Sequence, residues 1–309
     1  MASPNKTPLF DYHFEVGAKM VPVGNWTMPF QFGDGYKAEY MHAFEGTCIT
    51  DFCCAEIYRM TGANAEKMQK ITEFAAVGDC GFFEWKKEDR LIDTPFAVCM
   101  AEGDFLTAFA PSGKKICSEE FDAAEMQELS EIFGCIAVWG SGCYETLSKF
   151  GIEFGDWCGR SKKIEIDSVR CIACDVELDD GLPCVMLFFD REKADDVWIA
   201  LFNTAGVWAA GLGAWDLLRL QQIQPPYNAV NCRLPLLLCR WNGRKYPSKL
   251  AKVEWSVKNE IRQSQVIYAS VVPDTDEMFL LFSGEFEADS VVKMPENPAE
   301  SGVLLEQYC

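Results

Sequence analysis

The order of strand-like and helix-like segments limits the fold of this chain more than any other feature of its sequence. Alternating or apolar runs predict strands over residues 80–85, 91–100, 104–109, 135–139, 163–176 and 182–189. Apolar residues at helical spacing, or acidic residues crowded into a first turn, predict helices over residues 63–72, 118–133, 142–150, 193–204 and 216–222. Strands and helices mixed in this way indicate an α+β body.

The pattern changes after Pro225 and Pro226. Strands are predicted over residues 234–241, 250–257, 265–272 and 278–282, and the segment 295–301 has the composition of a loop. A chain of 309 residues is long enough for about two domains. We therefore predict an α+β domain over residues 1–225 and a β-rich C-terminal domain over residues 226–309.

The charge balance narrows the classes of partner. The chain carries a formal net charge of -19 at pH 7, whereas nucleic acids and anionic membranes are bound by dense positive surfaces. We therefore expect neither as a partner. Solubility explains the acidity most simply, and an acidic face that docks a basic partner protein is the alternative. No apolar run reaches the length of a membrane helix and no secretory signal opens the chain, so we expect a cytoplasmic protein.

The chain has 15 cysteines, an odd number at irregular spacing. Several of them lie inside apolar runs, where a cysteine usually acts as a small buried side chain. Cys171 and Cys174 form a CxxC motif, which leaves an iron–sulfur or thiol-redox role as a weaker alternative. Such a metal site normally needs a second pair of ligands, and only the adjacent Cys53 and Cys54 are closely spaced. With only two histidines in addition, we expect no metal site.

Five segments share their residues and their order with a known family. They are Thr7–Met28 (TPLFDYHFEVGAKMVPVGNWTM), Asp51–Ala55 (DFCCA), Leu91–Pro95 (LIDTP), Ala137–Leu147 (AVWGSGCYETL) and Ala210–Leu220 (AGLGAWDLLRL). Together they resemble the glycine-cleavage T-protein family, and the resemblance extends over about two-thirds of the chain. The C-terminal third matches poorly and is shorter than is usual in the family.

The resemblance implies a T-protein-like scaffold of class α+β, with a central ligand hole for tetrahydrofolate and a shortened β-rich C-terminal domain. It implies the transfer of a methyl or aminomethyl group to folate from a small-molecule or carrier-bound donor. A carrier protein or a corrinoid protein is the implied macromolecular partner. The alternative is a paralogue without catalytic activity that binds folate or serves as a partner subunit.

The resemblance also implies the site residues. Asp93 and Thr94 are the candidate catalytic pair, because the family carries two consecutive aspartates there and Thr94 stands at the second, catalytic position. Threonine can hydrogen-bond but cannot act as an acid near neutral pH. The candidate cofactor-binding residues are Trp85, Trp215 and Asp216, with Trp215 in the place of a family arginine.

Some of these residues also have a purely structural interpretation. Asp93 could be a polar residue satisfied within a strand. Asp216 could cap the N-terminus of a helix that begins there, and the glycines at 211 and 213 could serve tight packing. The family's pterin-binding glutamate is expected near residues 179–186 (DDGLPCVM), which retain only the acidic turn and Gly181 of the family motif, so no equivalent of it is predicted.

Overall fold

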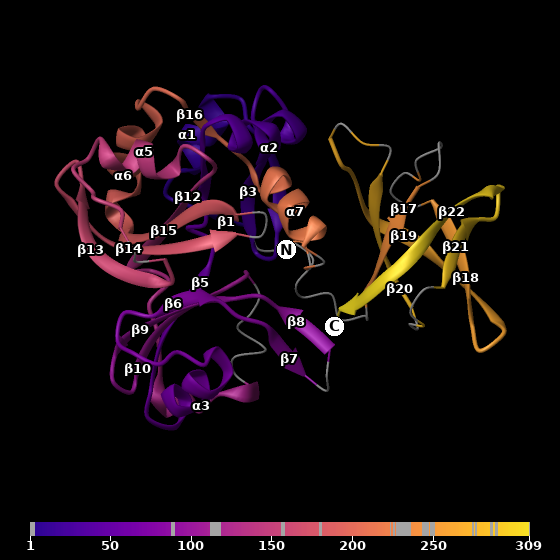
Figure 1. The fold of residues 1–309 in the computed structure, drawn as a ribbon, viewed down its shortest axis with the longest axis horizontal. Coiled ribbons are helices and arrows are strands. Elements are labelled where there is room, and N and C mark those ends of the chain that lie inside the picture. Colours follow the sequence, from indigo (N-terminus) through magenta and orange to yellow (C-terminus); the bar gives the residue numbers. More distant parts are fainter. Residues whose placement is uncertain are drawn as a thin grey trace. The chain divides into compact units, whose positions relative to one another are not determined.

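The computed structural model divides the chain into two compact units (Figure 1). The first unit comprises Met1–Trp85 and Thr94–Asp216, and the second comprises Lys86–Asp93 and Leu217–Cys309. The structure describes residues 4–87, 90–111, 119–155, 158–178, 181–222, 224, 226, 236–242, 247, 251–273, 275, 277–284, 287 and 290–308.

A six-stranded sheet forms the centre of the first unit. Its strand order is β13-β14-β15-β12-β4-β16, and all neighbours are antiparallel except β4 and β16. Strand β12 is buried along almost its whole length between β15 and β4. The bounds are β4 (Thr47–Asp51), β12 (Phe133–Trp139), β13 (Arg160–Ile166), β14 (Val169–Leu178), β15 (Leu182–Asp190) and β16 (Val207–Ala209).

Helices pack on one face of this sheet because their apolar residues form a single stripe. In α6 (Ala194–Phe202), the buried residues Ala194, Val197, Trp198 and Leu201 follow the helical spacing that places them on one side. They join the sheet residues in one core cluster, and each large side chain buried there stabilises the fold by about 1.5–3 kcal/mol. Residues of α1 (Phe10–Glu15) and α5 (Cys143–Ser148) join the same cluster, and the 3-10 turn η3 (Arg191–Lys193) directly precedes α6.

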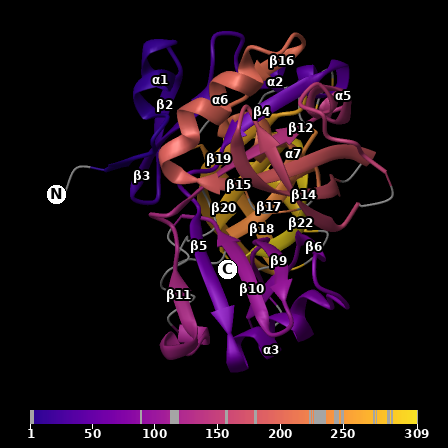
Figure 2. The same ribbon diagram turned by 90° about the vertical axis from the view of Figure 1, so that its left-hand side faces the viewer.

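A five-stranded antiparallel sheet forms the rest of the core of the first unit, with the order β11-β5-β10-β9-β6. Figure 2 shows this sheet in the lower part of the view and the six-stranded sheet in the upper part. Its elements are β5 (Glu56–Thr61), β6 (Cys80–Phe82), β9 (Phe96–Ala101), β10 (Asp104–Phe109), β11 (Met126–Glu128), helix α3 (Gly62–Thr72) and the 3-10 turn η1 (Ala123–Glu125).

The N-terminal residues of the first unit build a small third sheet of order β1-β3-β2. Strand β3 leads through a turn into helix α2, which precedes β4 directly. The bounds are β1 (Asn5–Lys6), β2 (Lys19–Val23), β3 (Trp26–Gln31) and α2 (Tyr36–Glu45). The division between the two units falls within a later helix, α7 (Leu212–Gln221), after Asp216.

The second unit is built almost entirely of strands. Its sheet has the order β17-β20-β19-β18-β21-β22-β8-β7, and a further pairing of β17 with β22 closes six of these strands into a ring. Inward side chains such as Trp241, Trp255 and Phe282 fill the ring. The bounds are β7 (Trp85–Lys87), β8 (Arg90–Asp93), β17 (Leu236–Trp241), β18 (Lys252–Val257), β19 (Glu260–Val271), β20 (Met278–Ser283), β21 (Val291–Met294) and β22 (Asn297–Tyr308).

The structure confirms the α+β class and most of the predicted elements. Helices α3, α5 and α6 lie where apolar spacing predicts them, and β12 and β15 match the predicted buried strands. The predicted boundary at residue 225 lies outside the described residues and stays a prediction, although the two units already divide after Asp216. None of the helices in the described ranges is both long and apolar enough to cross a membrane.

The helix predicted over residues 118–133 is wrong. Residues 119 and 120 are helical and residue 118 lies outside the described ranges, but the chain then forms the turn η1 and the edge strand β11. Strand β11 pairs with β5, so that Met126 lies opposite Met60. The long-range ladder therefore overrides the local helical propensity of this acidic segment.

Two further predictions are wrong because the chain turns where no turn was predicted. The single strand predicted over residues 163–176 is interrupted by a turn at Asp167 and Ser168, both of which adopt positive φ, and it forms the hairpin β13–β14. The loop predicted over residues 295–301 is only a two-residue turn at 295 and 296, and residues 297–301 belong to β22, which pairs with β21. In both cases a two-residue turn folds the chain back on itself into a hairpin, and local composition does not place that turn.

The cysteines are mostly buried, as expected. In the described part of the chain twelve cysteines are free thiols, of which only Cys158 is exposed. Cys171 and Cys174 lie three residues apart on β14, so their side chains point to opposite faces of the sheet. Cys171 belongs to the core beneath the helices, and the two thiols therefore do not form a common site.

The core of the second unit yields a stability prediction. Leu280 on β20 is fully buried, whereas Ile261 on β19 is 69% exposed. We expect Leu280→Ala to lower the free energy of unfolding by about 2–5 kcal/mol through lost burial and a residual cavity. The control Ile261→Thr should change it by less than about 0.5 kcal/mol. Urea denaturation measures both values, and equal effects would contradict the assigned core.

Candidate active site

All five predicted site residues lie next to a point where the chain passes from one unit to the other. The first segment of the first unit ends at Trp85, and the hairpin segment of the second unit ends at Asp93. Thr94 opens the second segment of the first unit, which closes with Trp215 and Asp216. The residues implied by the family resemblance therefore all lie at the chain crossings, the three points along the sequence where the chain passes from one unit to the other.

The start of helix α7 is packed against the end of strand β3. A Cβ atom added to Gly211 would come within 2.3 Å of the backbone of Phe30, and one added to Gly213 would come within 2.8 Å of the same residue. No side chain fits at either position, which confirms the tight-packing interpretation of these glycines. The close approach fixes the direction in which α7 leaves the sheet.

A buried carboxylate completes this junction. Glu39 on α2 is 1% exposed and accepts hydrogen bonds from the backbone N–H of Phe32 and from that of Gly211, the latter at 2.8 Å. Burial raises the pKa of Glu39, and the two backbone donors offset this only in part. Sequence reasoning missed Glu39, because its two partners lie 7 and 172 residues away in the chain.

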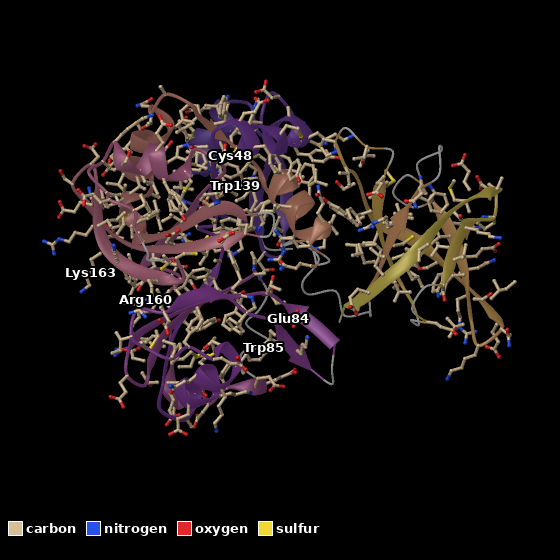
Figure 3. The ribbon with its side chains drawn as sticks, viewed as in Figure 1. Cys48, Glu84, Trp85, Trp139, Arg160 and Lys163 are labelled. Atoms are coloured by element: carbon tan, nitrogen blue, oxygen red, sulfur yellow. The ribbon has the colours of Figure 1, made fainter. Side chains whose placement is uncertain are left out.

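Trp215 on α7 is 2% exposed and belongs to an aromatic cluster. Its ring lies edge-on to Phe52 at 5.0 Å and to Trp139 at 5.5 Å, measured between ring centroids. Trp139, which Figure 3 labels at the end of β12, donates its indole N–H to Thr50. Where the family carries a charged side chain, this chain has a neutral ring packed among other rings.

Asp216 does not cap a helix, so that interpretation is wrong. Helix α7 begins at Leu212, which places Asp216 in the second turn, after the free N–H groups of the first turn. Its side chain is fully buried. A buried carboxylate at this position needs polar partners rather than solvent.

Trp85 opens strand β7 and is 3% exposed (Figure 3). Its ring lies 5.1 Å from Phe121 and 5.9 Å from Phe109, and the ammonium group of Lys67 stands 5.5 Å above it. The indole Nε1 is buried and has no hydrogen-bond acceptor among the residues that the structure describes. A buried donor of this kind is costly unless something accepts its hydrogen bond.

Asp93 and Thr94 are both buried, at 3% and 4% exposure. Within the second unit, the carboxylate oxygen Oδ1 of Asp93 lies 3.5 Å from Nη2 of Arg219, and both side chains are 4% exposed. Asp93 is thus part of a buried ion pair, which its sequence position alone does not reveal. Arg219 was not among the predicted site residues, although it is the penultimate residue of the family-like segment Ala210–Leu220.

A second buried acid lies in the first unit and anchors the N-terminal signature. Asp51 accepts hydrogen bonds from the Thr7 hydroxyl at 2.8 Å and from the Cys53 backbone N–H, and His13 lies 3.2 Å away. Burial alone would raise the pKa of Asp51, but the contacts with His13, Cys53 and Thr7 outweigh it and lower that pKa. This arrangement gives His13 and Asp51 a structural role.

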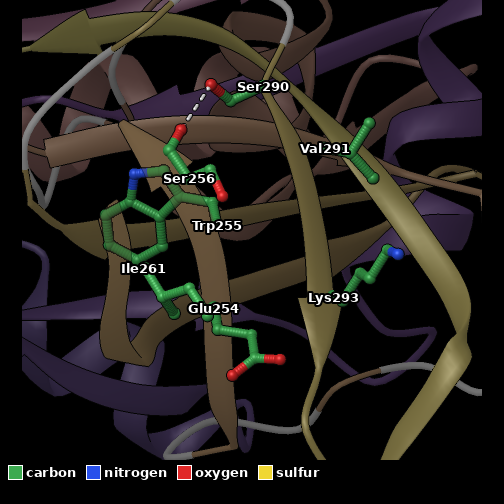
Figure 4. Close-up of a pocket in the computed structure, with 7 residues that line it drawn as sticks. All are labelled: Glu254, Trp255, Ser256, Ile261, Ser290, Val291 and Lys293. Carbon is green, nitrogen blue, oxygen red and sulfur yellow. Dashed lines mark hydrogen bonds between the residues drawn. The ribbon is translucent and has the colours of Figure 1, made fainter. Parts of the chain in front are cut away.

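Two hollows elsewhere on the molecule contain none of the five predicted residues. One, of about 510 Å³, lies on the six-stranded sheet beside Lys163, Arg170 and Phe188. The other, of about 330 Å³, lies between β18 and β21 (Figure 4). Its lining includes Glu254 and Lys293, and the Ser290 hydroxyl donates to the Ser256 carbonyl at one end. Among the described residues, no group of three or more His, Cys, Asp and Glu side chains is arranged to hold a metal ion.

Comparisons with known proteins identify relatives of the chain. The family profile described as "GCVT N-terminal domain" matches residues 9–229. An aminomethyltransferase of Deinococcus deserti is 28% identical over 248 residues, which cover 72% of this chain and 65% of that protein. An aminomethyltransferase of Desulforamulus reducens is 22% identical over 247 residues with the same coverage. The matched region thus spans slightly less than two-thirds of the length of these relatives.

The solved structure of the glycine cleavage system aminomethyltransferase T from Bartonella henselae has the same fold. The two structures agree with a TM-score of 0.73 over 98% of this chain and 97% of that chain, at 15% sequence identity. The fold is therefore that of a glycine-cleavage T protein. Since the matched profile covers more than half of the chain, the protein belongs to the GCVT family, as a divergent member.

The buried Asp51 yields a prediction about pH. The pKa of Asp51 is lower in the folded chain than its ordinary value of 3.8. At pH values above 3.8 the ionised carboxylate therefore makes its full contribution to the stability of the fold. That contribution is lost as the pH falls through the pKa of Asp51 in the folded chain. We expect Asp51→Asn to cost about 3 kcal/mol at neutral pH, because it breaks a buried polar cluster. The difference from the wild type should shrink as the pH falls toward 3.

Urea denaturation over this pH range measures the effect. Asp167→Asn is the matched control, because Asp167 is an exposed turn residue whose positive φ asparagine also tolerates. The assignment is wrong if the gap between the wild type and Asp51→Asn stays constant with pH.

Proposed function

We propose that this protein transfers a one-carbon group, methyl or aminomethyl, from a donor to tetrahydrofolate. Membership of the GCVT family and the names of the aminomethyltransferase relatives support the class of reaction. The observation that carries the proposal is the buried carboxylate of Asp93 at the end of β8, next to Thr94. A buried, ionised acceptor suits the donor-rich edge of a pterin ring.

Other groups at the chain crossings support a folate ligand. The indole N–H of Trp85 is buried and lacks an acceptor among the described residues, so a ligand oxygen or nitrogen would satisfy it. Within the first unit, Asp216 is also a buried carboxylate and Trp215 is a buried indole ring. We propose Asp93 and Thr94 as the catalytic residues and Trp85, Trp215 and Asp216 as cofactor-binding residues.

The departures from the family pattern bear on the donor. Thr94 cannot exchange a proton in the way the family's aspartate does. Trp215 stands where the family has an arginine, so the positive charge of that arginine is missing. Methyl transfer to folate depends mainly on positioning and on exclusion of water, so it tolerates these losses better than aminomethyl transfer. We therefore propose a small O-, N- or S-methyl compound as the donor, and a carrier or corrinoid protein as the second candidate source of the group. We propose the cytoplasm as the compartment.

Binding of tetrahydrofolate is the first test. Isothermal titration calorimetry should show saturable binding to the wild type, and Asp93→Asn should weaken it roughly ten- to hundredfold, the cost of one hydrogen bond to a charged group. The exposed-residue variant Asp167→Asn should bind like the wild type. A wild type that gives no saturable heat would overturn the proposed function.

Turnover separates the enzyme from a paralogue that only binds folate. Incubation of the protein with tetrahydrofolate and methyl donors of each class should yield methylated folate, detected by mass spectrometry. Thr94→Asp should lower this transfer at least about tenfold, because it places a new charge at a position that is 4% exposed. Folate binding without turnover on any donor would favour the paralogue. Higher turnover in Thr94→Asp would instead indicate the family's carboxylate chemistry.

A further inference from the structure

Arg219 is a buried cation for which the family pattern gave no role. It is the only basic residue of helix α7, whose sequence is LGAWDLLRLQ. Its residue exposure is 3%, and its Nη2 atom lies 3.5 Å from the carboxylate of Asp93. The pair joins the end of helix α7 to the end of strand β8 within the second unit.

The energetics of burial make the two charges depend on each other. A guanidinium group stays protonated in proteins, and a lone carboxylate in an apolar environment tends to lose its charge. A neighbouring cation at this distance favours the ionised carboxylate. Removal of one partner of such a pair leaves the other charge buried without compensation, whereas removal of both is often tolerated.

The strand that carries Asp93 is held within the second unit. Strand β8 pairs in parallel with β22, where Leu91 lies opposite Tyr308. Both side chains of the ion pair are 4% exposed, so neither has much room to adopt another rotamer. The carboxylate therefore meets the guanidinium in a confined place rather than through two mobile side chains.

We propose that Arg219 is a positioning residue for the one-carbon transfer: it holds the ionised carboxylate of Asp93 in place, and Asp93 accepts hydrogen bonds from N–H groups of the folate ring. The proposal rests on the proposed function. It assigns Asp93 the role of an acceptor rather than a proton donor. It also assigns the cation of α7 a role one turn beyond Trp215, where the family arginine is missing.

A double-mutant cycle on tetrahydrofolate binding tests this role. The four proteins are the wild type, Asp93→Asn, Arg219→Met and the double variant, each titrated calorimetrically after circular dichroism has confirmed folding. We expect Arg219→Met to weaken binding at least about tenfold in the wild-type background, the loss expected for one charge-assisted contact. In the Asp93→Asn background the same change should weaken it by less than about twofold, because Arg219 acts through Asp93.

Two further variants separate positioning from a general structural effect. Arg219→Lys keeps the charge and should retain most of the affinity that Arg219→Met loses. It also keeps the test open if Arg219→Met fails to fold. Arg262→Met removes a cation that pairs with Glu260 on β19 of the same unit, and it should bind tetrahydrofolate like the wild type.

The outcomes are distinct. Equal losses from Arg219→Met in both backgrounds, or an Arg219→Lys variant as weak as Arg219→Met, would overturn the positioning role while the proposed function stands. A wild type that binds no tetrahydrofolate would overturn both, and the calorimetry of the wild type alone reveals this case.

Discussion

The contact between strand β3 and the first turn of helix α7 is the constraint on which the candidate site depends. Gly211 and Gly213 allow the backbone of Phe30 to approach where any side chain would collide. Glu39 then ties the same turn to the chain that follows β3, through the N–H groups of Phe32 and Gly211. Since a helix is stiff, this one junction sets the direction of the part of α7 that belongs to the first unit. The aromatic face at Trp215 and the buried acid at Asp216 are positioned by it.

Buried charge is used differently in the two units. In the first unit the carboxylate of Asp51 contacts Thr7, His13 and the backbone of Cys53. These contacts hold the N-terminal family-like segment in place. In the second unit Asp93 is balanced by Arg219. Asp51 is thus held mainly by hydrogen bonds from neutral or backbone groups and by a histidine, whereas Asp93 faces a guanidinium group.

The sequence predicts those parts of the fold that local patterns determine. The stripe of α6 and the buried strand β12 each carry their signal within a few residues. The segment 118–133 failed because β11 owes its extended form to β5, more than sixty residues earlier. The candidate site shows the same limit. Family-like motifs point to Asp93 and Trp215. The ion-pair partner of Asp93 is Arg219, and no local pattern connects a residue on a strand with one on a distant helix.

The pairing of β8 with β22 also has a consequence for synthesis. Leu91 finds its partner at Tyr308, which the ribosome adds more than two hundred residues later. At the usual rate of ~5–20 residues per second, the edge of β8 waits on the order of ten seconds or more before β22 can cover it. For that interval a nascent chain presents an open strand edge to its neighbours. The hairpin that carries Asp93 is therefore synthesised early and paired with β22 last. Aggregation between crowded nascent chains, or slow action of a chaperone, would affect this strand edge first.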